Sequence, residues 1–491
     1  MTIRFPFDNS YAALPQNFFA RVAPTPVAAP RLIALNGPLA VQLGLDPEAL
    51  ASSDGVAVLA GQIVPEGADP LAMAYAGHQF GNFVPRLGDG RAILLGEVID
   101  SDGIRRDIQL KGSGPTPFSR RGDGRAALGP VLREYIVSEA MSALGIPTTR
   151  SLAAVITGEN VARQTMLPGG VLTRIASSHI RVGTFQYFAA QQDQAGIRAL
   201  ADHVIARHYP DAANAASPYL ALLKGVMARQ AELVAQWLLV GFIHGVMNTD
   251  NCSVAGETID YGPCAFMDEY NPAQVFSSID ENGRYAYANQ PGIAKWNVTR
   301  LAECLLVLLD DDTEKAVAIA QETLGQFAER FETAYVAGLR RKLGLFTEHT
   351  DDRLLAEDLL EAMARNQADF TLTFRRLSDA AADPAADTLV RELFTDPSVY
   401  DDWAVSWQKR LALEPEQAAQ RSSAMRAVNP AFIPRNHRIE AVIAAAIDND
   451  FAPFHELVAV LAKPFADQPD HADYMTPPLL NERVLQTFCG T

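Results

Sequence analysis

In the first third of the chain, short apolar runs are bounded by turn-forming residues, a pattern that predicts β-strands. Four runs have this pattern: residues 91–100, 106–111, 151–156 and 171–175. The first two flank a Ser-Asp-Gly turn at 101–103, and Pro-Gly-Gly at 168–170 separates the last two. The hydrophobic pattern therefore predicts a mostly β region in the early part of the chain.

Apolar positions at a spacing of about 3.6 residues indicate helices elsewhere. One helix is expected from Pro130 to about Leu144, where a Gly and a Pro follow and end it. A longer apolar stripe through residues 222–238 predicts a helix that leads to His244. The helices thus begin beside the predicted strands and dominate the later part of the chain.

Changes in pattern divide the rest of the chain. Residues 252–260 are expected to form strand, turn and strand, and helices rich in Ala, Leu and Glu fill 297–375. The segment 378–387, rich in Ala, Asp and Pro, is typical of a linker. Four parts follow from these changes: an N-terminal extension with short helices at 1–65, a mostly β part at 66–170, a mostly helical part at 171–376, and a final helical part with a polar tail at 389–491.

Composition restricts the class of protein. Of the 491 residues, 48% are hydrophobic and 20% are charged, as in a globular protein with an ample core. The net charge of −17 argues against a broad surface for nucleic acid or anionic membrane. The N-terminus lacks the apolar region of a secretory signal, and no stretch approaches the ~20 uninterrupted apolar residues of a membrane span. We therefore expect a cytoplasmic protein that binds neither nucleic acid nor membrane.

The strongest chemical signal follows the long predicted helix. His244 and Asn251 keep the seven-residue separation of the His-x-Asp-x-x-x-x-Asn catalytic loop of protein kinases, and Asp260 opens an Asp-aromatic-Gly triplet. The oxygens of Asn251 and Asp260 suit a hard divalent cation, Mg²⁺ or Mn²⁺. Val246 occupies the position of the kinase catalytic base, and a carboxylate lies instead at Asp250. The segment predicts a kinase-type nucleotide site whose chemistry has changed.

Taken with this segment, the order of the parts predicts an α+β fold of the two-lobed protein-kinase-like type. Its mostly β N-lobe would comprise residues 66–170. Its larger helical C-lobe would comprise residues 171–376 and contain the catalytic segment 244–263, with residues 389–491 as an extra helical part.

Glycine-rich and basic strings point to a phosphate site within this acidic chain. Gly88, Gly90 and Arg91 form such a string between two strands, where the backbone can approach phosphates closely, although a common hairpin turn has the same composition. Residues 119–127 repeat the string with three arginines, which suits an anion-binding loop or a solvated one. Residues 173–181 add two arginines, each of which can grip a phosphate or form a structural salt bridge.

Lys111 ends a predicted strand 21 residues past Gly90, a separation comparable to that of the phosphate-binding Lys of kinases. In kinases that Lys pairs with a Glu of the next helix. Glu134 is the candidate partner here, and Glu139 in the same helix is its rival. A strand-end Lys that is merely solvated is the alternative.

Five motifs carry a family resemblance. They are YAGHQFGN at 75–82, QLKGSGPTP at 109–117, HIRVGTFQ at 179–186, HGVMNTDN at 244–251 and IDYGP at 259–263. With them the chain resembles the selenoprotein O family of pseudokinase-fold enzymes, which transfer AMP from ATP to proteins. The motifs span residues 75–263, and the length and C-terminal tail of the chain also fit that family.

The resemblance implies roles for individual residues. Nucleotide contacts would come from Gly88, Gly90, Arg91, Lys111, Asp123, Gly124, Arg174, Arg181 and Asp260. Lys111 would pair with Glu134, Asn251 and Asp260 would bind the metal ion, and Asp250 would accept a proton. The resemblance also implies an ATP that is turned end for end relative to kinases.

The leading functional prediction is therefore protein adenylylation. A Ser, Thr or Tyr hydroxyl of a protein substrate would attack the α-phosphorus of ATP, and UTP is a second candidate donor. An ordinary kinase acting on a protein or small molecule is one alternative, which Val246 counts against. A catalytically inactive nucleotide-binding scaffold is another, although Asn251, Asp260 and Lys111 are all present.

A redox hypothesis concerns two of the four cysteines. Cys264 lies two residues past Gly262, and Cys489 lies where the eukaryotic members of the family carry selenocysteine. A disulfide between them would clamp the segment and switch activity through a thiol reductase partner. Two unrelated thiols in a reducing cytosol are the alternative, and we expect Cys252 and Cys304 to lie in the core.

Overall fold

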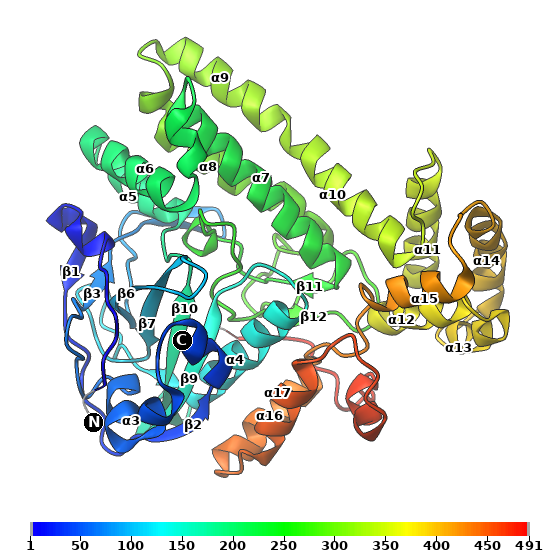
Figure 1. Cartoon of the computed structure of the whole chain (residues 1–491), viewed down its shortest axis with the longest axis horizontal. Coiled ribbons are helices and arrows are strands. Elements are labelled where there is room, and N and C mark those ends of the chain that lie inside the picture. The colour runs from blue at the N-terminus through cyan, green and yellow to red at the C-terminus, as the bar shows by residue number, and fades with distance from the viewer. Residues whose placement is uncertain (1–2, 489–491) are drawn as a thin grey trace.

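The computed structural model describes residues 3–488, and in this part of the chain eight strands form one antiparallel sheet (Figure 1). The strand order is β1-β3-β6-β7-β10-β9-β2, with β8 paired to β10. The strands are β1 Phe19–Arg21, β2 Arg31–Leu35, β3 Leu71–Met73, β6 Ala92–Ile99, β7 Arg105–Lys111, β8 Ala126–Ala127, β9 Arg150–Ala162 and β10 Met166–Ala176. The fold is thus mixed α+β, with an antiparallel sheet and many helices.

The central strands agree with the hydrophobic pattern, but one predicted break is wrong. β6 and β7 pair across the expected turn. Pro168, Gly169 and Gly170 do not separate β9 from β10, since they lie inside β10 at a shift in register. A bulge tolerates the missing N–H of proline and the flexibility of glycine, which explains why this string does not end the strand.

Helices cover both faces of the sheet. On one face lie α1 Gly37–Gln42, α2 Pro47–Ala51 and α3 Ser53–Leu59, whose apolar side chains pack with Leu95, Ile108 and Val155. On the other face α4, Leu128–Ala143, packs against β9 and β10. Residues 3–65 therefore contribute two strands and one helical layer to the sheet.

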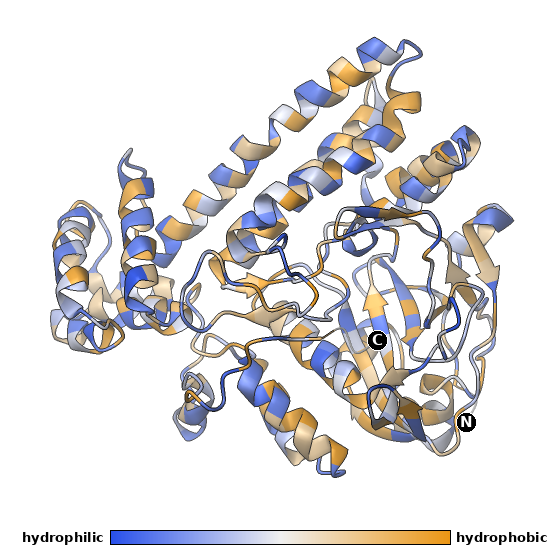
Figure 2. Cartoon of the chain, turned by 180° about the vertical axis from the view of Figure 1, so that it is seen from behind, coloured by the Kyte–Doolittle hydropathy of each residue, from blue (hydrophilic) through white to orange (hydrophobic). Residues whose placement is uncertain are grey.

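The long helices lie to one side of the sheet (Figure 1). They are α5 Val182–Ala190, α6 Gln194–His208, α7 Pro218–Leu239, α8 Gln290–Leu309, α9 Thr313–Gly325 and α10 Phe327–Lys342. α7 begins with a proline in its first turn and buries Leu222, Val226, Val234 and Trp237, which confirms the predicted stripe. In Figure 2 the helices carry both orange and blue positions, as amphipathic helices do.

The remaining helices form two groups. α11 Asp352–Asn366, α12 Phe370–Ala380, α13 Asp387–Arg391, α14 Pro397–Leu411 and α15 Ala418–Arg426 extend from the end of α10, whereas α16 Asn436–Ile447 and α17 Ala452–Leu461 return to contact α4 (Figure 1). The predicted linker 378–387 is largely helical, because α12 continues to Ala380 and a short 3₁₀ helix, Pro384–Ala386, follows. Within residues 3–488, no helix is long and apolar enough to span a membrane.

The segment that joins α7 to α8 differs from its prediction. Residues 252–260 do not pair with each other as a hairpin. Ser253 instead bridges to Arg181, and Thr258 bridges to Thr148. Arg181 and Thr148 thus supply the backbone pairing that the two halves of a hairpin would have supplied to each other. These bridges connect the segment to the start of α5 and to the sheet region.

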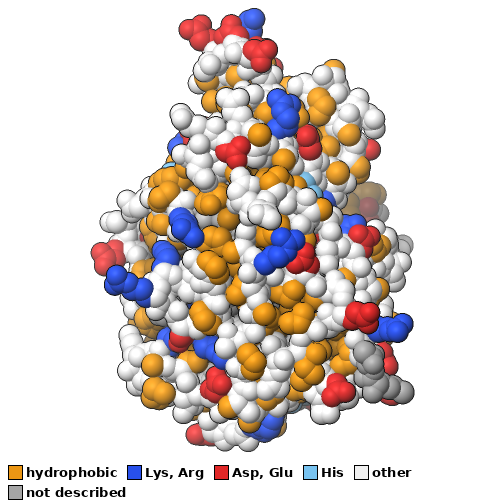
Figure 3. Space-filling view, turned by 90° about the vertical axis from the view of Figure 1, so that its left-hand side faces the viewer, with side chains coloured by type: hydrophobic (Ala, Val, Ile, Leu, Met, Phe, Trp, Pro, Cys, Tyr) orange, Lys and Arg blue, Asp and Glu red, His pale blue; other side chains and the backbone are white. Residues whose placement is uncertain are grey.

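Surface charge is mixed on the face that Figure 3 shows. Lys and Arg side chains are interspersed there with Asp and Glu, and hydrophobic side chains are scattered between them. This face carries no broad patch of one sign.

Candidate active site

A cavity of about 850 Å³ opens between the sheet, the loop 119–125 and the segment 246–263. Its wall includes all twelve residues for which nucleotide, metal, ion-pair or base roles were predicted. They are Gly88, Gly90, Arg91, Lys111, Asp123, Gly124, Glu134, Arg174, Arg181, Asp250, Asn251 and Asp260. Side chains that are up to 172 positions apart in sequence thus share one space.

Three cations and two carboxylates meet at the base of the cavity. Lys111 Nζ lies 2.5 Å from Glu134 Oε2 and 3.1 Å from Asp260 Oδ1. Arg174 donates to Glu134 at 2.8 Å and to Asp260 at 2.6 Å, and Arg181 lies 3.2 Å from Asp260 Oδ2. Burial by itself would raise the pKa of Asp260, but the three cations hold it well below its ordinary value. Asp260 is therefore a permanent anion at neutral pH.

The helix partner of Lys111 is Glu134. Its rival Glu139 lies elsewhere, where it accepts hydrogen bonds from Arg150 and Asn36. Burial opposes ionisation of Glu134, yet Arg174 and Lys111 lower its pKa below the usual value. The paired, charged state of this cluster is thus the stable one.

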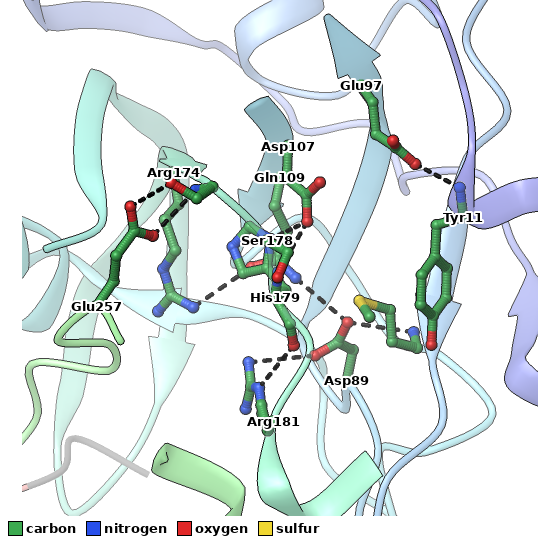
Figure 4. Close-up of polar contacts among 12 residues, drawn as sticks. Tyr11, Asp89, Glu97, Asp107, Gln109, Arg174, Ser178, His179, Arg181 and Glu257 are labelled. Carbon is green, nitrogen blue, oxygen red and sulfur yellow. Dashed lines mark hydrogen bonds and ion pairs between the residues drawn. The ribbon is translucent and has the colours of Figure 1, made fainter. Parts of the chain in front are cut away.

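Polar side chains at alternate positions of β7 form hydrogen bonds with residues that lie beside this cluster (Figure 4). Gln109 donates to Asp89 at 3.2 Å and accepts from Arg174 at 3.4 Å. Asp107 accepts from both the backbone N–H and Nδ1 of His179, at 2.9 and 2.8 Å. Because alternate residues of a strand face the same side, residues 107, 109 and 111 form one polar stripe. That spacing was a signal in the sequence, although Asp89, Asp107 and Gln109 were not predicted as site residues.

His179, held by Asp107, in turn contacts Arg181. Its carbonyl oxygen accepts from Arg181 Nε at 3.3 Å, and Arg181 also lies 3.7 Å from Asp89 (Figure 4). Arg181 in turn donates through Nη1 to the backbone oxygen of Asp250 at 2.9 Å. One buried guanidinium therefore bridges the backbone of Asp250 to the carboxylate of Asp260.

Asp250 lies in a short 3₁₀ helix, Thr249–Asn251, and is buried. Burial raises the pKa of Asp250 to about 6, and the nearby Arg181 and a hydrogen bond from Gln79 limit the rise. At neutral pH the group is ionised but is a stronger base than an ordinary carboxylate. Val246 lines the same cavity without an ionisable group, whereas Asp250 supplies a carboxylate to it.

Asn251 and His244, in the same loop as Asp250, make different contacts with the backbone. Asn251 Nδ2 donates to Val246 O at 3.0 Å, which leaves its amide oxygen as the atom suited to a cation. His244 is buried, and its Nε2 contacts the backbone oxygen of Ile259 at 2.9 Å. Burial lowers the pKa of His244, so the ring is neutral and braces the loop through its contact with Ile259.

The loop 119–125 is built from unusual backbone conformations. Arg120, Arg121 and Gly124 have φ angles of 48°, 81° and 66°. A Cβ at Gly124 would lie 2.1–2.2 Å from the backbone of Gly114, so only glycine fits. Asp123 accepts from Arg163 at 2.8 Å, which anchors the loop at its exposed side. Two strained arginines in a cavity wall are typical of a functional site.

The donor set fits a hard divalent cation with few protein ligands. No group of three or more His, Cys, Asp or Glu residues within the described chain has the arrangement of a metal site. Asn251 and Asp260 both line the cavity, and both oxygens of Asp260 already contact cationic side chains. Mg²⁺ typically takes only one or two protein carboxylates and completes its shell with water and substrate phosphates, so a metal ion here would depend on the substrate for most of its ligands.

The core positions expected for Cys252 and Cys304 are confirmed, whereas the pairing of Cys264 with Cys489 stays a prediction. Cys252 and Cys304 are buried, and burial raises the pKa of each thiol to about 12. Cys264 is also buried and lies outside the cavity wall. Cys489 lies outside the described residues.

Comparison with known proteins gives the family of the chain. The family model described as protein adenylyltransferase SelO matches residues 2–462. A protein nucleotidyltransferase YdiU of Bradyrhizobium diazoefficiens is 73% identical over 492 residues and covers the full length of both chains. Proteins of the same name from Rhodopseudomonas palustris strains BisB18 and BisB5 are 71% and 70% identical, again over the full length of both chains.

Proposed function

The chain belongs to the SelO family of protein adenylyltransferases, and from that premise we propose that it transfers AMP from ATP to Ser, Thr or Tyr hydroxyls of proteins. Nucleotidyl transfer itself is the activity of this enzyme class. The observation that carries the finer proposal is the shared cavity, in which Lys111, Arg174 and Arg181 surround Asp260 while Asp250 replaces the missing base at Val246.

We propose that the fold is of the two-lobed kinase type. The sheet with α4 would be the N-lobe, predicted as residues 66–170, and α5 to α12 would belong to the C-lobe, predicted as residues 171–376, although β1, β2 and the ends of β10 and α12 lie outside those ranges. The ion pair of Lys111 with Glu134 and the Asp-Tyr-Gly triplet at 260–262 support this reading, since kinases hold ATP with the same pair and triplet.

The cations would bind the β- and γ-phosphates and leave the α-phosphorus near Asp250. Gly88, Gly90, Arg91, Asp123 and Gly124 line the same cavity and would contact the phosphate tail of an inverted nucleotide. Mg²⁺ or Mn²⁺, bound by Asn251 and Asp260, would neutralise charge on the phosphates. Arg174 and Arg181 would stabilise the charge that builds as the leaving group departs.

Asp250 would act as the general base. The acceptor oxygen forms a bond to the α-phosphorus, the bond from that phosphorus to the α–β bridging oxygen breaks, and pyrophosphate leaves. The hydroxyl proton moves to the carboxylate of Asp250. A pKa of about 6 suits this step, because the group is ionised at neutral pH yet basic enough to accept a proton. UTP would give UMP transfer by the same chemistry.

Labelled nucleotide tests the proposal. Purified protein is incubated with α-³²P-ATP or γ-³²P-ATP, and incorporation into protein is measured. We expect label only from the α position, loss of labelling in Asp260→Ala, and labelling that is strongly reduced but still measurable in Asp250→Asn. The exposed Asp448→Asn is the matched control and should label normally. Label from the γ position alone would show a kinase, and no label from either would show an inactive scaffold.

The redox hypothesis remains a proposal of its own. Under it, Cys264 and Cys489 form a disulfide that a thiol reductase partner opens in a reducing cytoplasm. Mass spectrometry of a non-reduced digest, prepared under oxidising conditions, should then contain a linked 264–489 peptide. Its absence would remove the hypothesis without affecting the transferase proposal.

A further inference from the structure

The hairpin formed by β4, Gly77–Gln79, and β5, Asn82–Val84, lies against the catalytic loop. His78 N donates to Thr249 Oγ1 at 2.7 Å, and Phe80 N donates to Asn248 Oδ1 at 3.0 Å. Gln79 Nε2 donates to Asp250 Oδ2 at 3.2 Å. Three successive residues of one hairpin therefore hold three successive residues of the loop.

The two carboxylate oxygens of Asp250 have different surroundings. Oδ1 is buried and has no hydrogen-bond partner among residues 3–488, and it lies so close to Gly77 that a Cβ there would be only 2.4 Å away. Oδ2 receives the hydrogen bond from Gln79, whose side chain lines the same cavity as Asp250. An incoming hydroxyl can therefore be met by Oδ2 far more readily than by Oδ1.

The hairpin is built as a rigid support. Its turn residues Phe80 and Gly81 have φ angles of 50° and 86°, the combination that tight two-residue hairpins require and that a phenylalanine rarely adopts. The ring of Phe80 lies 5.0 Å from that of Tyr285, whose hydroxyl donates to Asn248. Such a turn persists only when surrounding contacts impose it, which makes the position of Gln79 a specified one.

Polar contacts lock the base of the hairpin as well. Gln186 of α5 contacts His78 Nδ1 at 2.8 Å and accepts from Thr249 Oγ1 at 2.6 Å. The hairpin, α5 and the catalytic loop are thereby joined in one partly buried network. Gln79 is the residue of this network whose side chain reaches the carboxylate itself.

We propose that Gln79 is a positioning residue of the transfer reaction. Its amide N–H holds Oδ2 of Asp250 in place beside the cavity, so that this oxygen accepts the proton of the acceptor hydroxyl. Gln79 neither gains nor loses a proton in the step. The inference rests on the proposed function and specifies how the base is oriented for it.

A double-mutant cycle tests the inference. Gln79→Met keeps nearly the shape of the side chain but removes its N–H donor. Gln79→Ala removes both the shape and the donor. Each is measured alone and combined with Asp250→Asn, using transfer of label from α-³²P-ATP. We expect Gln79→Met to lower kcat roughly 10- to 100-fold while the KM for ATP changes less than about 2-fold. In the Asp250→Asn background the same change should cost less than about 2-fold, because residues that act as one unit are not additive.

Other outcomes overturn the inference. If Gln79→Met transfers AMP as the wild type does, shape alone matters and the hydrogen bond does not. Additive losses, or a raised KM for ATP with normal kcat, would also refute a role through Asp250. If the melting curve shows that Gln79→Met does not fold, the same cycle with Gln79→Ala tests the inference instead. Asn82→Ala, on the exposed strand opposite Gln79, is the matched control and should keep wild-type kcat.

Failure of the inference can be told from failure of the proposed function. Absence of α-label transfer by the wild-type protein would refute adenylylation itself. Normal transfer by the wild type, with no effect of Gln79 substitution, would refute only the positioning role.

Discussion

The approach of Gly77 to Asp250 makes Gly77→Ala a sharp test of the site geometry. A Cβ at this position would lie 2.4 Å from Asp250 Oδ1 and 2.9 Å from both its Cβ and Cγ, whereas ordinary contact begins near 3.4 Å. The backbone of Gly77 is outside the left-handed region, so alanine adds only its methyl group and no backbone strain. The hairpin and the carboxylate must therefore move apart by about 1 Å, a displacement that costs roughly 100-fold in rate at a catalytic group.

The assay compares kcat and KM for transfer from α-³²P-ATP in Gly77→Ala and the wild type. We expect kcat to fall roughly 100-fold with the KM for ATP changed less than about 2-fold, because the three atoms nearest to the added methyl all belong to Asp250 and none to the cations proposed to bind phosphate. Gly325→Ala at the end of α9 is the control, since no atom lies within 4 Å of its added methyl. A Gly77→Ala enzyme with wild-type kcat would refute the argument that the hairpin fixes Asp250.

Three further predictions concern stability. Glu134→Gln removes the carboxylate that pairs with Arg174 and Lys111, so the free energy of unfolding in urea should fall by roughly 3 kcal/mol. An unchanged midpoint of urea unfolding would contradict this. Burial lowers the pKa of His203 to about 4 from 6.5, so the unfolded chain binds the extra proton between these values. Stability should therefore fall as pH drops from 6.5 to 4, by up to about 1.4 kcal/mol per pH unit, and His203→Gln should flatten that slope in acid-titrated melting curves. Burial also lowers the pKa of Lys342 to about 7, and its Nζ lies 4.2 Å from the ring of Phe374. Lys342→Met should raise the unfolding free energy at pH 7 by about 1–2 kcal/mol, and a lower melting temperature would refute this.

Local patterns predicted the elements that depend on local chemistry. The stripe of α7, the turn between β6 and β7, and the helix α4 all follow from periodicity and stop signals. Residues 252–260 did not form the expected hairpin because distant partners, Arg181 and Thr148, supplied their bridges. Pro168 did not end a strand because the pairing with β9 accommodates a shift in register there.

The sequence predicted residues of the site, but it did not predict the contacts between them. Residue types, spacing and the family resemblance pointed to the cations, the carboxylates and the oxygens for a metal ion, and the structure brings these residues to one cavity. Their roles there stay predictions. The supporting side chains Asp89, Gln109 and Gln79 were missed, since a buried Gln or Asp has the same appearance in sequence as a surface one. Only the alternation at 107, 109 and 111 could have indicated the polar stripe of β7.

The amino-acid sequence alone therefore determined which chemical groups this protein has and which short elements carry them. The tertiary structure decided which groups meet, because the decisive contacts join distant parts of the chain. Lys111 and Asp260 are 149 residues apart, and Gln79 and Asp250 are 171 residues apart. Packing of the sheet against the helices sets those distances and the burial that shifts the pKa of Asp250 to about 6. Local propensity carries no information about either, since burial and long-range contact exist only once the whole chain has folded.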